Sequence, residues 1–164
     1  MNRTIMSLKD FAVPMTKRID VPPVWLIGFG VLAWIQAAYL PAGLSLAGPV
    51  TDLLGGTLVG GGIILIFLAV TEFRRHKTTV IPHHTPARLI QSGIFSRTRN
   101  PIYLGDALVL AGLILRFDAV LSLVLIPVFV WVIERRFVLP EEDRMRRAFR
   151  ADFARYEQKV RRWL

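Results

Sequence analysis

Residues 92–103 read Ser-Gly-Ile-Phe-Ser-Arg-Thr-Arg-Asn-Pro-Ile-Tyr and bring arginine, asparagine and aromatic side chains to the start of an apolar segment. Asparagine is a favoured N-cap and proline is favoured at the first helical position, so the pattern predicts a helix that begins at Pro101. Backbone N–H groups at such a helix entrance point outward and can hold an anion. A second polar cluster, at residues 135–142, follows the next apolar segment. Together the two clusters predict one polar site at the surface of a membrane.

The composition excludes an ordinary soluble domain. The chain has 164 residues, 53% of them hydrophobic, and a mean hydropathy of +0.46, so lipid must solvate much of its surface. Its net charge of +9 falls in short runs between apolar segments, which indicates a lipid bilayer and not nucleic acid as the partner. Because the sequence has no cysteine, disulfides, thiolate nucleophiles and cysteine-ligated metals are excluded. The length predicts a single domain over residues 1–164.

Four apolar segments predict an all-α fold, a polytopic membrane helical bundle with about four transmembrane helices. The segments are 24–40, 53–70, 101–115 and 119–133. The last two are shorter than the ~20 residues that span a bilayer. Lysine and arginine in the short loops set the orientation, and their clusters all fall on one side: Lys17, Arg18, Arg74, Arg75, Lys77, Arg97, Arg99, Arg135 and Arg136. Both termini are therefore expected in the cytosol, with the inner membrane as the location in a bacterium.

The polar segments divide into three parts. Residues 1–23 predict a cytosolic N-terminal segment, residues 71–100 a cofactor-site loop too long to be a mere connector, and residues 140–164 an amphipathic cytosolic helix. Apolar side chains follow at steps of three and four along this helix: Met145, Phe149, Phe153, Tyr156, Val160 and Trp163. The helix is expected over the cytosolic end of the bundle or in the lipid interface.

Gly56 and Gly60 form a G-x-x-x-G pair in the second apolar segment. Such a pair lets another helix backbone approach closely. Packing within the chain is the preferred interpretation, and assembly into an oligomer is the alternative.

Two further groups of ionisable residues have opposite interpretations. His83 and His84, with His76 as the only other histidine, do not predict a metal site, because a catalytic metal usually takes three protein ligands of suitable geometry. Glu141 and Glu142 follow a proline, and the helix dipole favours acids in a first helical turn. A carboxylate there can also accept two hydrogen bonds from a ribose diol.

Several spaced elements of the C-terminal half resemble the isoprenylcysteine carboxyl methyltransferase family, which includes related phospholipid methyltransferases. The elements are residues 89–103, Glu141-Glu142, Phe149, Tyr156, Val160 and Arg162-Trp163. The family pattern reads Leu-Val-x-x-Gly-x-Tyr, Arg-His-Pro-x-Tyr, a two-helix hairpin, Glu-Glu, and Phe-Gly-x-x-Tyr-x-x-Tyr with Arg-Trp near the end. This sequence departs from it where Phe95 replaces tyrosine, Asn100 histidine, Arg150 glycine and Phe153 tyrosine.

The resemblance implies a membrane-embedded enzyme that transfers a methyl group from S-adenosyl-L-methionine and releases S-adenosyl-L-homocysteine. It implies a cofactor pocket lined by Ala87, Arg88, Leu89, Ile90, Phe95, Asn100, Pro101, Ile102 and Tyr103. Glu141 would hold the cofactor, with Glu142 in support. The family's substrate-contacting arginine falls at Phe137, so the resemblance transfers this catalytic role to the adjacent Arg136.

The expected acceptor is a hydrophobic or lipidated carboxylate. A carboxylate needs no general base at pH 7, and Arg136 can hold one oxygen while the other attacks. Methylation of a phospholipid or another lipid at nitrogen is an alternative, although an amine must first lose a proton. A membrane NADPH-type reductase is another, because the family shares its fold with sterol reductases and Arg97 with Arg99 would suit a phosphate. A non-enzymatic membrane scaffold assembled through Gly56 and Gly60 is the last.

Overall fold

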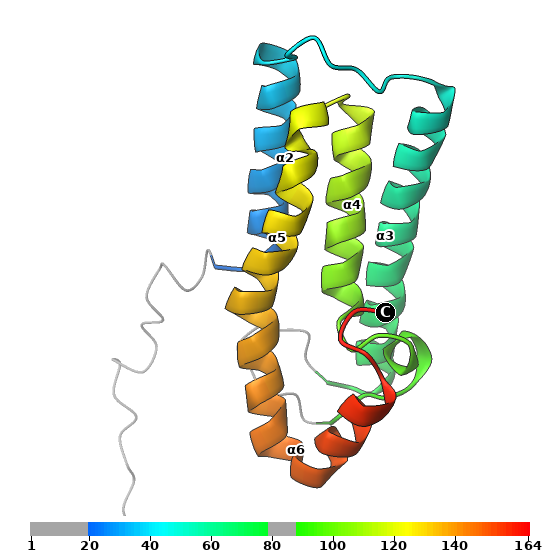
Figure 1. Cartoon of the computed structure of the whole chain (residues 1–164). Coiled ribbons are helices and arrows are strands. Elements are labelled where there is room, and N and C mark those ends of the chain that lie inside the picture. Colours follow the sequence, from blue (N-terminus) through cyan, green and yellow to red (C-terminus); the bar gives the residue numbers. More distant parts are fainter. Residues whose placement is uncertain (1–19, 79–87) are drawn as a thin grey trace, which may run out of the picture.

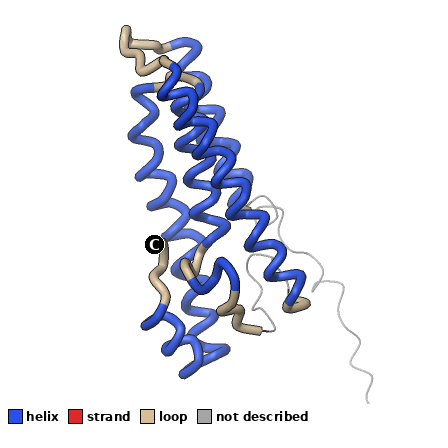
Figure 2. Tube along the Cα trace, turned by 90° about the vertical axis from the view of Figure 1, so that its right-hand side faces the viewer, coloured by secondary structure: helices blue, strands red, loops and turns tan. Residues whose placement is uncertain are grey.

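The computed structural model describes residues 20–78 and 88–164, and all regular secondary structure in these two ranges is helical. The long helices α2 (Pro22–Tyr39), α3 (Pro49–Arg75) and α4 (Pro101–Arg116) lie side by side with α5 (Leu125–Ile133), as Figure 1 shows. Short helical turns precede α4 and α5, namely η2 (Gly93–Ser96) and η3 (Val120–Val124). The predicted all-α class is therefore confirmed for the described chain, which Figure 2 shows as helices joined by loops.

Three of the long helices begin at a proline. Pro22, Pro49 and Pro101 occupy the first helical turn of α2, α3 and α4. Proline suits this place because the missing N–H would have no partner inside the helix and its fixed φ is already helical. The predicted helix start at Pro101 is thus confirmed.

Glycines bring α3 and α4 into close contact. A Cβ atom added to Gly62 would lie 2.5 Å from the carbonyl oxygen of Gly105, and one added to Gly112 would lie 2.6 Å from that of Gly55. The two pairs allow the backbones to approach along this antiparallel interface. Gly56 and Gly60 have no heavy atom within 4 Å of an added Cβ, so the expectation that these two pack within the chain is wrong. Their role in an oligomer stays a prediction.

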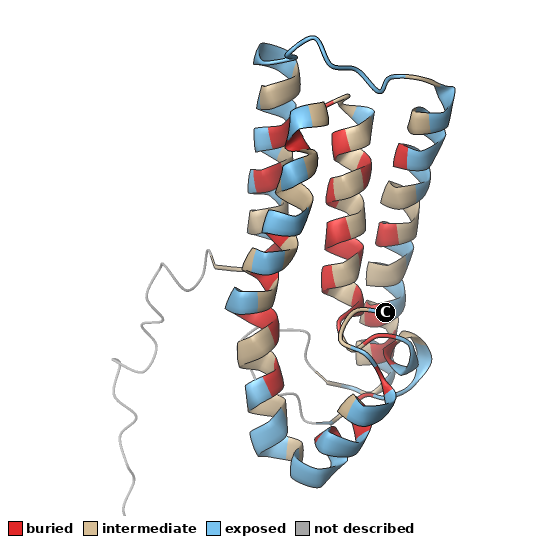
Figure 3. Cartoon of the chain, viewed as in Figure 1, coloured by how far each residue is buried: buried red, intermediate tan, exposed pale blue. Residues whose placement is uncertain are grey.

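Two of the four expected membrane spans have the length and apolar composition that a bilayer requires. These are α2, with 18 residues, and α3, with 27. The helices α4, with 16 residues, and α5, with 9, are each shorter. Large apolar side chains such as Ile27, Phe67 and Trp34 are exposed on α2 and α3, and Figure 3 shows both helices exposed on their outer sides. Lipid is the solvent that stabilises such surfaces.

The core lies between α2, α4 and α5. Phe29, Leu110, Ile114, Phe129 and Ile133 are buried there in one cluster, and the rings of Phe29 and Phe129 meet edge to face at 5.3 Å between centroids. These residues recur at helical spacing in their own segments, which is why each helix turns an apolar face to the core.

The last helix continues directly from α5. A π-helical turn, η4 (Glu134–Val138), joins α5 to α6 (Leu139–Lys159), and Pro140 lies in the first turn of α6. Proline cannot donate to the residue four positions earlier and its ring crowds that carbonyl group, so a widened turn directly before it relieves this conflict. Arg150 has φ 42° and ψ −114°, and the chain folds back there (Figures 1 and 2).

The fold-back confirms the amphipathic character of residues 140–164 but adds a break that the sequence pattern did not predict. After it, Phe153, Tyr156 and Val160 are buried, with Leu89, Met145 and Phe149 packed against them. The Tyr156 hydroxyl donates a hydrogen bond to the carbonyl oxygen of Phe95 at 2.6 Å. The C-terminal segment therefore covers the end of the bundle at which α4 begins.

Candidate functional site

The two polar clusters meet at Tyr103 and Glu141, which are 38 positions apart in the sequence. The hydroxyl of Tyr103 donates a hydrogen bond to Oε2 of Glu141 at 3.0 Å. Tyr103 lies in the first turn of α4 and is only 9% exposed, and its ring stacks on Phe137 of η4. The proline fixes the start of α4, and α6 continues from α5 through η4 without a break. The first turn of α4 and the first turn of α6 therefore lie next to each other.

Tyr103 and Glu141 line a common cavity of about 340 Å³. The cavity lies between the beginnings of α2 and α4 and the end of α3, and Glu141 of α6 contributes to its wall. The lining residues of the described chain are Val21, Pro22, Pro23, Phe73, Phe95, Arg99, Asn100, Pro101, Ile102, Tyr103 and Glu141. This volume is within the range of sites that hold small molecules and cofactors.

Six of the residues predicted for the cofactor pocket line this cavity: Phe95, Asn100, Pro101, Ile102, Tyr103 and Glu141. Ala87 and the histidines at 83 and 84 lie outside the described residues, as does most of the predicted N-terminal segment. Arg88 is exposed, and Leu89 packs against the cluster of Phe153. Ile90 is buried beside Phe95, so it supports the wall from behind.

Sequence reasoning missed the contribution of α2 and α3 to the cavity. Residues 21–23 and Phe73 are apolar and carry no chemical signature in the sequence, so nothing but the fold could place them. The rings of Phe73 and Phe95 meet edge to face, with centroids 5.3 Å apart. Together they give the cavity a mostly apolar surface.

Arg99 is the charged lining residue that the predicted set omitted. Its Nη2 atom forms an ion pair with Oε1 of Glu142 at 3.0 Å, and its Nη1 atom lies 3.8 Å from Oε2 of Glu157. Its buried Nε and Nη1 atoms make no hydrogen bond in the described chain. Donors of this kind cost free energy unless they are satisfied, and the ion pairs with Glu142 and Glu157 offset part of this cost. Arg99 directly precedes the Asn100-Pro101 helix start, and this position in the sequence could have indicated that it lies at the site.

Asn100 occupies the N-cap position of α4, but its side chain does not cap the helix. Its Nδ2 atom instead donates a hydrogen bond to the carbonyl oxygen of Arg162 at 3.0 Å, and the hydroxyl of Thr98 donates to the same oxygen at 3.2 Å. The N–H of Arg99 donates to the carbonyl oxygen of Arg161. These hydrogen bonds hold residues 98–100, which precede α4, against the C-terminal segment.

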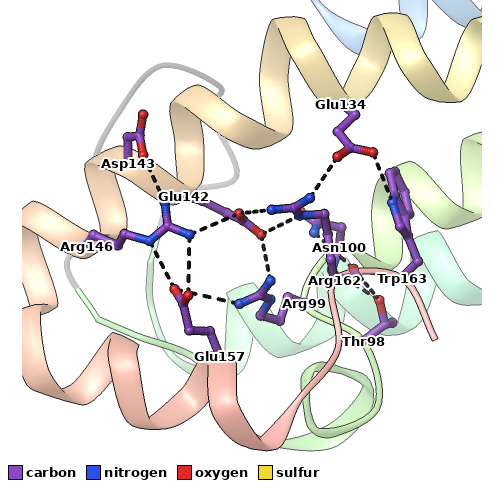
Figure 4. Close-up of polar contacts among 10 residues, drawn as sticks. All are labelled: Thr98, Arg99, Asn100, Glu134, Glu142, Asp143, Arg146, Glu157, Arg162 and Trp163. Atoms are coloured by element: carbon purple, nitrogen blue, oxygen red, sulfur yellow. Dashed lines mark hydrogen bonds and ion pairs between the residues drawn. The ribbon is translucent and has the colours of Figure 1, made fainter.

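Glu142 lies at the centre of a network of ion pairs that Figure 4 shows. Its side chain is buried and lies within 4 Å of the guanidinium groups of Arg99, Arg146 and Arg162. The hydrogen bond to Glu142 is the main reason why the pKa of Arg162 is raised. Glu142 is not among the lining residues, and it contacts the lining of the cavity through its ion pair with Arg99.

Arg136, predicted to contact the substrate, has a different partner in this structure. Its Nε atom lies 2.7 Å from Oδ1 of Asp20, and its guanidinium lies 5.3 Å from the centroid of the Trp25 ring. It is not among the lining residues of the cavity. The ion pair instead fixes the beginning of α2, which forms one wall of the cavity.

The fold and the site define a helical membrane protein with a cofactor-sized cavity at one end of its bundle. A family model described as phospholipid methyltransferase matches residues 50–152, which is more than half of the chain. The protein belongs to this family, and the resemblance seen in the sequence is confirmed. Searches of curated proteins and of solved structures found no match.

Proposed function

We propose that the protein transfers the methyl group of S-adenosyl-L-methionine to a hydrophobic lipid acceptor at the membrane surface. The observation that carries this proposal is the cavity shared by Tyr103 and Glu141, because two distant polar clusters of a methyltransferase family member converge there. Arginines concentrate at this end of the bundle, so the positive-inside tendency supports a cytosolic location for the cavity.

The residues of the cavity fit the parts of this cofactor. The guanidinium group of Arg99, which lines the cavity, suits its carboxylate, and the carboxylate of Glu141, oriented by Tyr103, suits a ribose diol. The rings of Phe73 and Phe95 suit the flat adenine base. Each of these groups lines the same cavity.

When bound, the cofactor supplies an electrophilic methyl group on a sulfonium. The chain's task is therefore mainly to align the acceptor and to exclude water. Apolar residues at the starts of α2 and α4 exclude water from the cavity wall, while Tyr103 fixes the orientation of Glu141. Glu142 holds Arg99 in place from outside the cavity.

Two acceptor chemistries are considered. For a carboxylate, Arg136 was expected to hold one oxygen, but its ion pair with Asp20 lies outside the set of lining residues. Among the described lining residues Glu141 is acidic and Arg99 is basic, so the charge of the lining does not select one acceptor. Because the matching family is described as phospholipid methyltransferase, we favour a lipid amine, as in a phospholipid, with the lipidated carboxylate as the second candidate.

The reductase and scaffold alternatives receive less support. Family membership favours a methyltransferase over both. Arg97, which was paired with Arg99 for a phosphate, is not among the lining residues. The exposed faces of Gly56 and Gly60 are compatible with assembly but explain nothing about the cavity.

Calorimetric titration of the purified protein with S-adenosyl-L-homocysteine tests the proposal. We expect saturable binding that Glu141→Gln weakens, because the amide can no longer accept two hydrogen bonds from a diol. Asp52→Asn, at an exposed ion pair at the opposite end of the bundle, is the matched control and should bind like the parent. Absence of binding to the parent protein contradicts the proposal.

A further inference from the structure

Glu72 is a buried carboxylate in the last turn of α3 that the predicted site did not include. It is only 4% exposed. The hydroxyl of Ser92 donates a hydrogen bond to its Oε2 atom at 2.6 Å, and Nη1 of Arg75 donates to its Oε1 atom at 2.9 Å. Nε2 of His76 lies 2.9 Å from the same serine hydroxyl and 3.5 Å from Oε2 of Glu72. Arg75 and His76 adjoin Glu72 in sequence, whereas Ser92 is 20 positions away, in the loop before α4 (residues 88–100).

The backbone of this loop also lies directly against Glu72. A Cβ atom added to Gly93 would lie 2.6 Å from Cδ of Glu72 and 2.7 Å from its Oε1 atom. Gly93 has φ 57°, a conformation that glycine adopts without steric cost. The loop before α4 therefore docks on Glu72 through the side chain of Ser92 and through the backbone of Gly93.

The docked loop carries one half of the aromatic wall of the cavity. Ala69, Glu72 and Phe73 are three and four positions apart, so they share one face of α3. Ala69 is buried in a cluster with Ile90 and Phe95 of the loop. Phe73 and Phe95 meet edge to face and both line the cavity, whereas Glu72 is not among its described lining residues. Glu72 thus lies behind the contact that brings the two rings together.

We propose that Glu72 is a positioning residue, which docks the loop before α4 on α3 and so fixes the Phe73 and Phe95 rings for the flat base of a cofactor. The inference rests on the proposed function for the identity of the ligand, whereas the docking of the loop does not depend on it. Glu72 acts through Ser92 and Gly93, because it does not itself line the cavity.

The physical reason is preorganisation. Ordering a loop costs conformational entropy at each residue, and one edge-to-face pair of rings offsets only a small part of this cost. A hydrogen bond from a hydroxyl to a carboxylate is stronger than one between neutral groups. When the loop is already docked on Glu72, a ligand need not supply the free energy of ordering it, and binding is tighter.

The first test measures the docking of the loop without any ligand. The sequence has no cysteine, so Ile90→Cys places a single thiol at a buried position of the loop. A water-soluble maleimide should modify this thiol slowly in detergent micelles, because it reacts only when the loop opens. Adding Ser92→Ala should speed the reaction about 10-fold, the effect of one lost hydrogen bond to a charged group. Adding Glu72→Ala should speed it at least as much.

Arg75→Ala is the matched control for this measurement. It removes another partner of the same carboxylate, but the arginine side chain is 74% exposed and belongs to α3 itself. Exposed ion pairs contribute little, so the rate of modification should stay within about 2-fold of that in the Ile90→Cys protein. An unchanged rate after Ser92→Ala and Glu72→Ala would overturn the docking role.

The second test measures the dissociation constant of S-adenosyl-L-homocysteine by calorimetry. Ser92→Ala and Glu72→Ala should each weaken binding about 5- to 10-fold, because part of the binding free energy is then spent on docking the loop. Glu72→Gln should keep more affinity than Glu72→Ala, since its amide oxygen still accepts the hydrogen bond from Ser92. A merely structural role would lower the unfolding midpoint and leave the dissociation constant of the folded protein unchanged.

A double-mutant cycle tests the contact between Gly93 and Glu72. Gly93→Ala places a methyl group against the carboxylate and should speed modification of the thiol at position 90. In the Glu72→Ala background this clash is absent, so the same substitution should have a smaller effect. Additive effects of the two substitutions would contradict a docking contact between these residues.

The outcomes separate this proposal from the proposed function. If the parent protein fails to bind S-adenosyl-L-homocysteine, the proposed function falls, and the rates of modification still decide the docking role of Glu72. If the parent protein binds but the dissociation constant is the same in Ser92→Ala and Glu72→Ala, the positioning role is overturned while methyl transfer stands. Should Glu72→Ala not fold, Ser92→Ala decides, because Ser92 is exposed and its hydroxyl can be removed without opening the core.

Discussion

Arg162 donates two hydrogen bonds to the carboxylate of Glu142, from Nε to Oε1 at 3.0 Å and from Nη2 to Oε2 at 2.8 Å. This paired geometry joins the C-terminal segment to the first turn of α6. The same Glu142 holds Arg99, which lines the cavity, so the folding of the tail and the shape of the site depend on one buried carboxylate.

Glu142→Gln should therefore destabilise the protein by about 3 kcal/mol, because it leaves the largely buried guanidinium group of Arg99 without its nearest counter-charge. Thermal unfolding in detergent measures the loss. Asp143→Asn is the matched control, since the neighbouring Asp143 is exposed and forms its ion pair with Arg146, which is itself partly exposed. It should change stability by less than about 0.5 kcal/mol. Equal effects of the two substitutions would refute the central role of Glu142.

Tyr103→Phe should weaken binding of S-adenosyl-L-homocysteine by about 5- to 10-fold, the effect of one lost hydrogen bond that orients Glu141. Calorimetric titration measures the dissociation constant. Tyr39→Phe removes a hydroxyl from an exposed side chain at the far end of α2 and should bind like the parent. An unaltered dissociation constant in Tyr103→Phe would show that the hydrogen bond does not serve the ligand.

Gly62→Ala should destabilise the protein by about 1–3 kcal/mol, because the added methyl group meets the carbonyl oxygen of Gly105 and forces α3 and α4 apart. Gly60→Ala lies on the same helix with open space around it, so its higher helix propensity should leave stability unchanged or raise it. Unfolding midpoints of the two variants provide the comparison. Destabilisation by Gly60→Ala instead would point to an interface between protein copies at that position.

Acid should loosen the loop between α2 and α3. The hydroxyl of Ser45 and the N–H of Leu46 donate hydrogen bonds to Asp118, and they lower the pKa of its carboxyl below the ordinary value of 3.8. The carboxylate therefore contributes stability above pH 3.8, and this contribution is lost as the pH falls through the lowered pKa. Asp118 has φ 53°, which asparagine tolerates, so Asp118→Asn preserves the backbone.

The unfolding midpoint, followed from pH 6 to pH 3, checks this prediction. Asp118→Asn should have a shallower loss of stability with acid than the parent protein. Ser45→Ala removes the first hydrogen-bond donor and should flatten the profile in the same direction. Parallel profiles for all three proteins would exclude Asp118 as a contributor.

Local patterns predicted much of the fold. The Asn-Pro pair gave the start of α4 correctly, because proline acts on its own turn and needs no tertiary contact. The apolar stripe of the last helix was also correct at Phe153, Tyr156 and Val160, since periodicity reports which face a helix buries. The reversal at Arg150 was missed, because an arginine with positive φ is held there by the surrounding structure and not by its own preference.

The candidate site can also be divided into features that the sequence predicted and features that only the fold determined. The residue pattern alone determined that a polar helix entrance at Tyr103 and an acidic turn at Glu141 belong to one methyltransferase family, because their chemistry and spacing are written along the chain. Only the tertiary structure decided that Arg99 lines the cavity, that Arg136 pairs with Asp20 and that Oδ2 of Asp106 is buried with no hydrogen-bond partner among the described residues. The environment of a charged side chain depends on which helices pack around it, and that packing joins residues far apart in sequence.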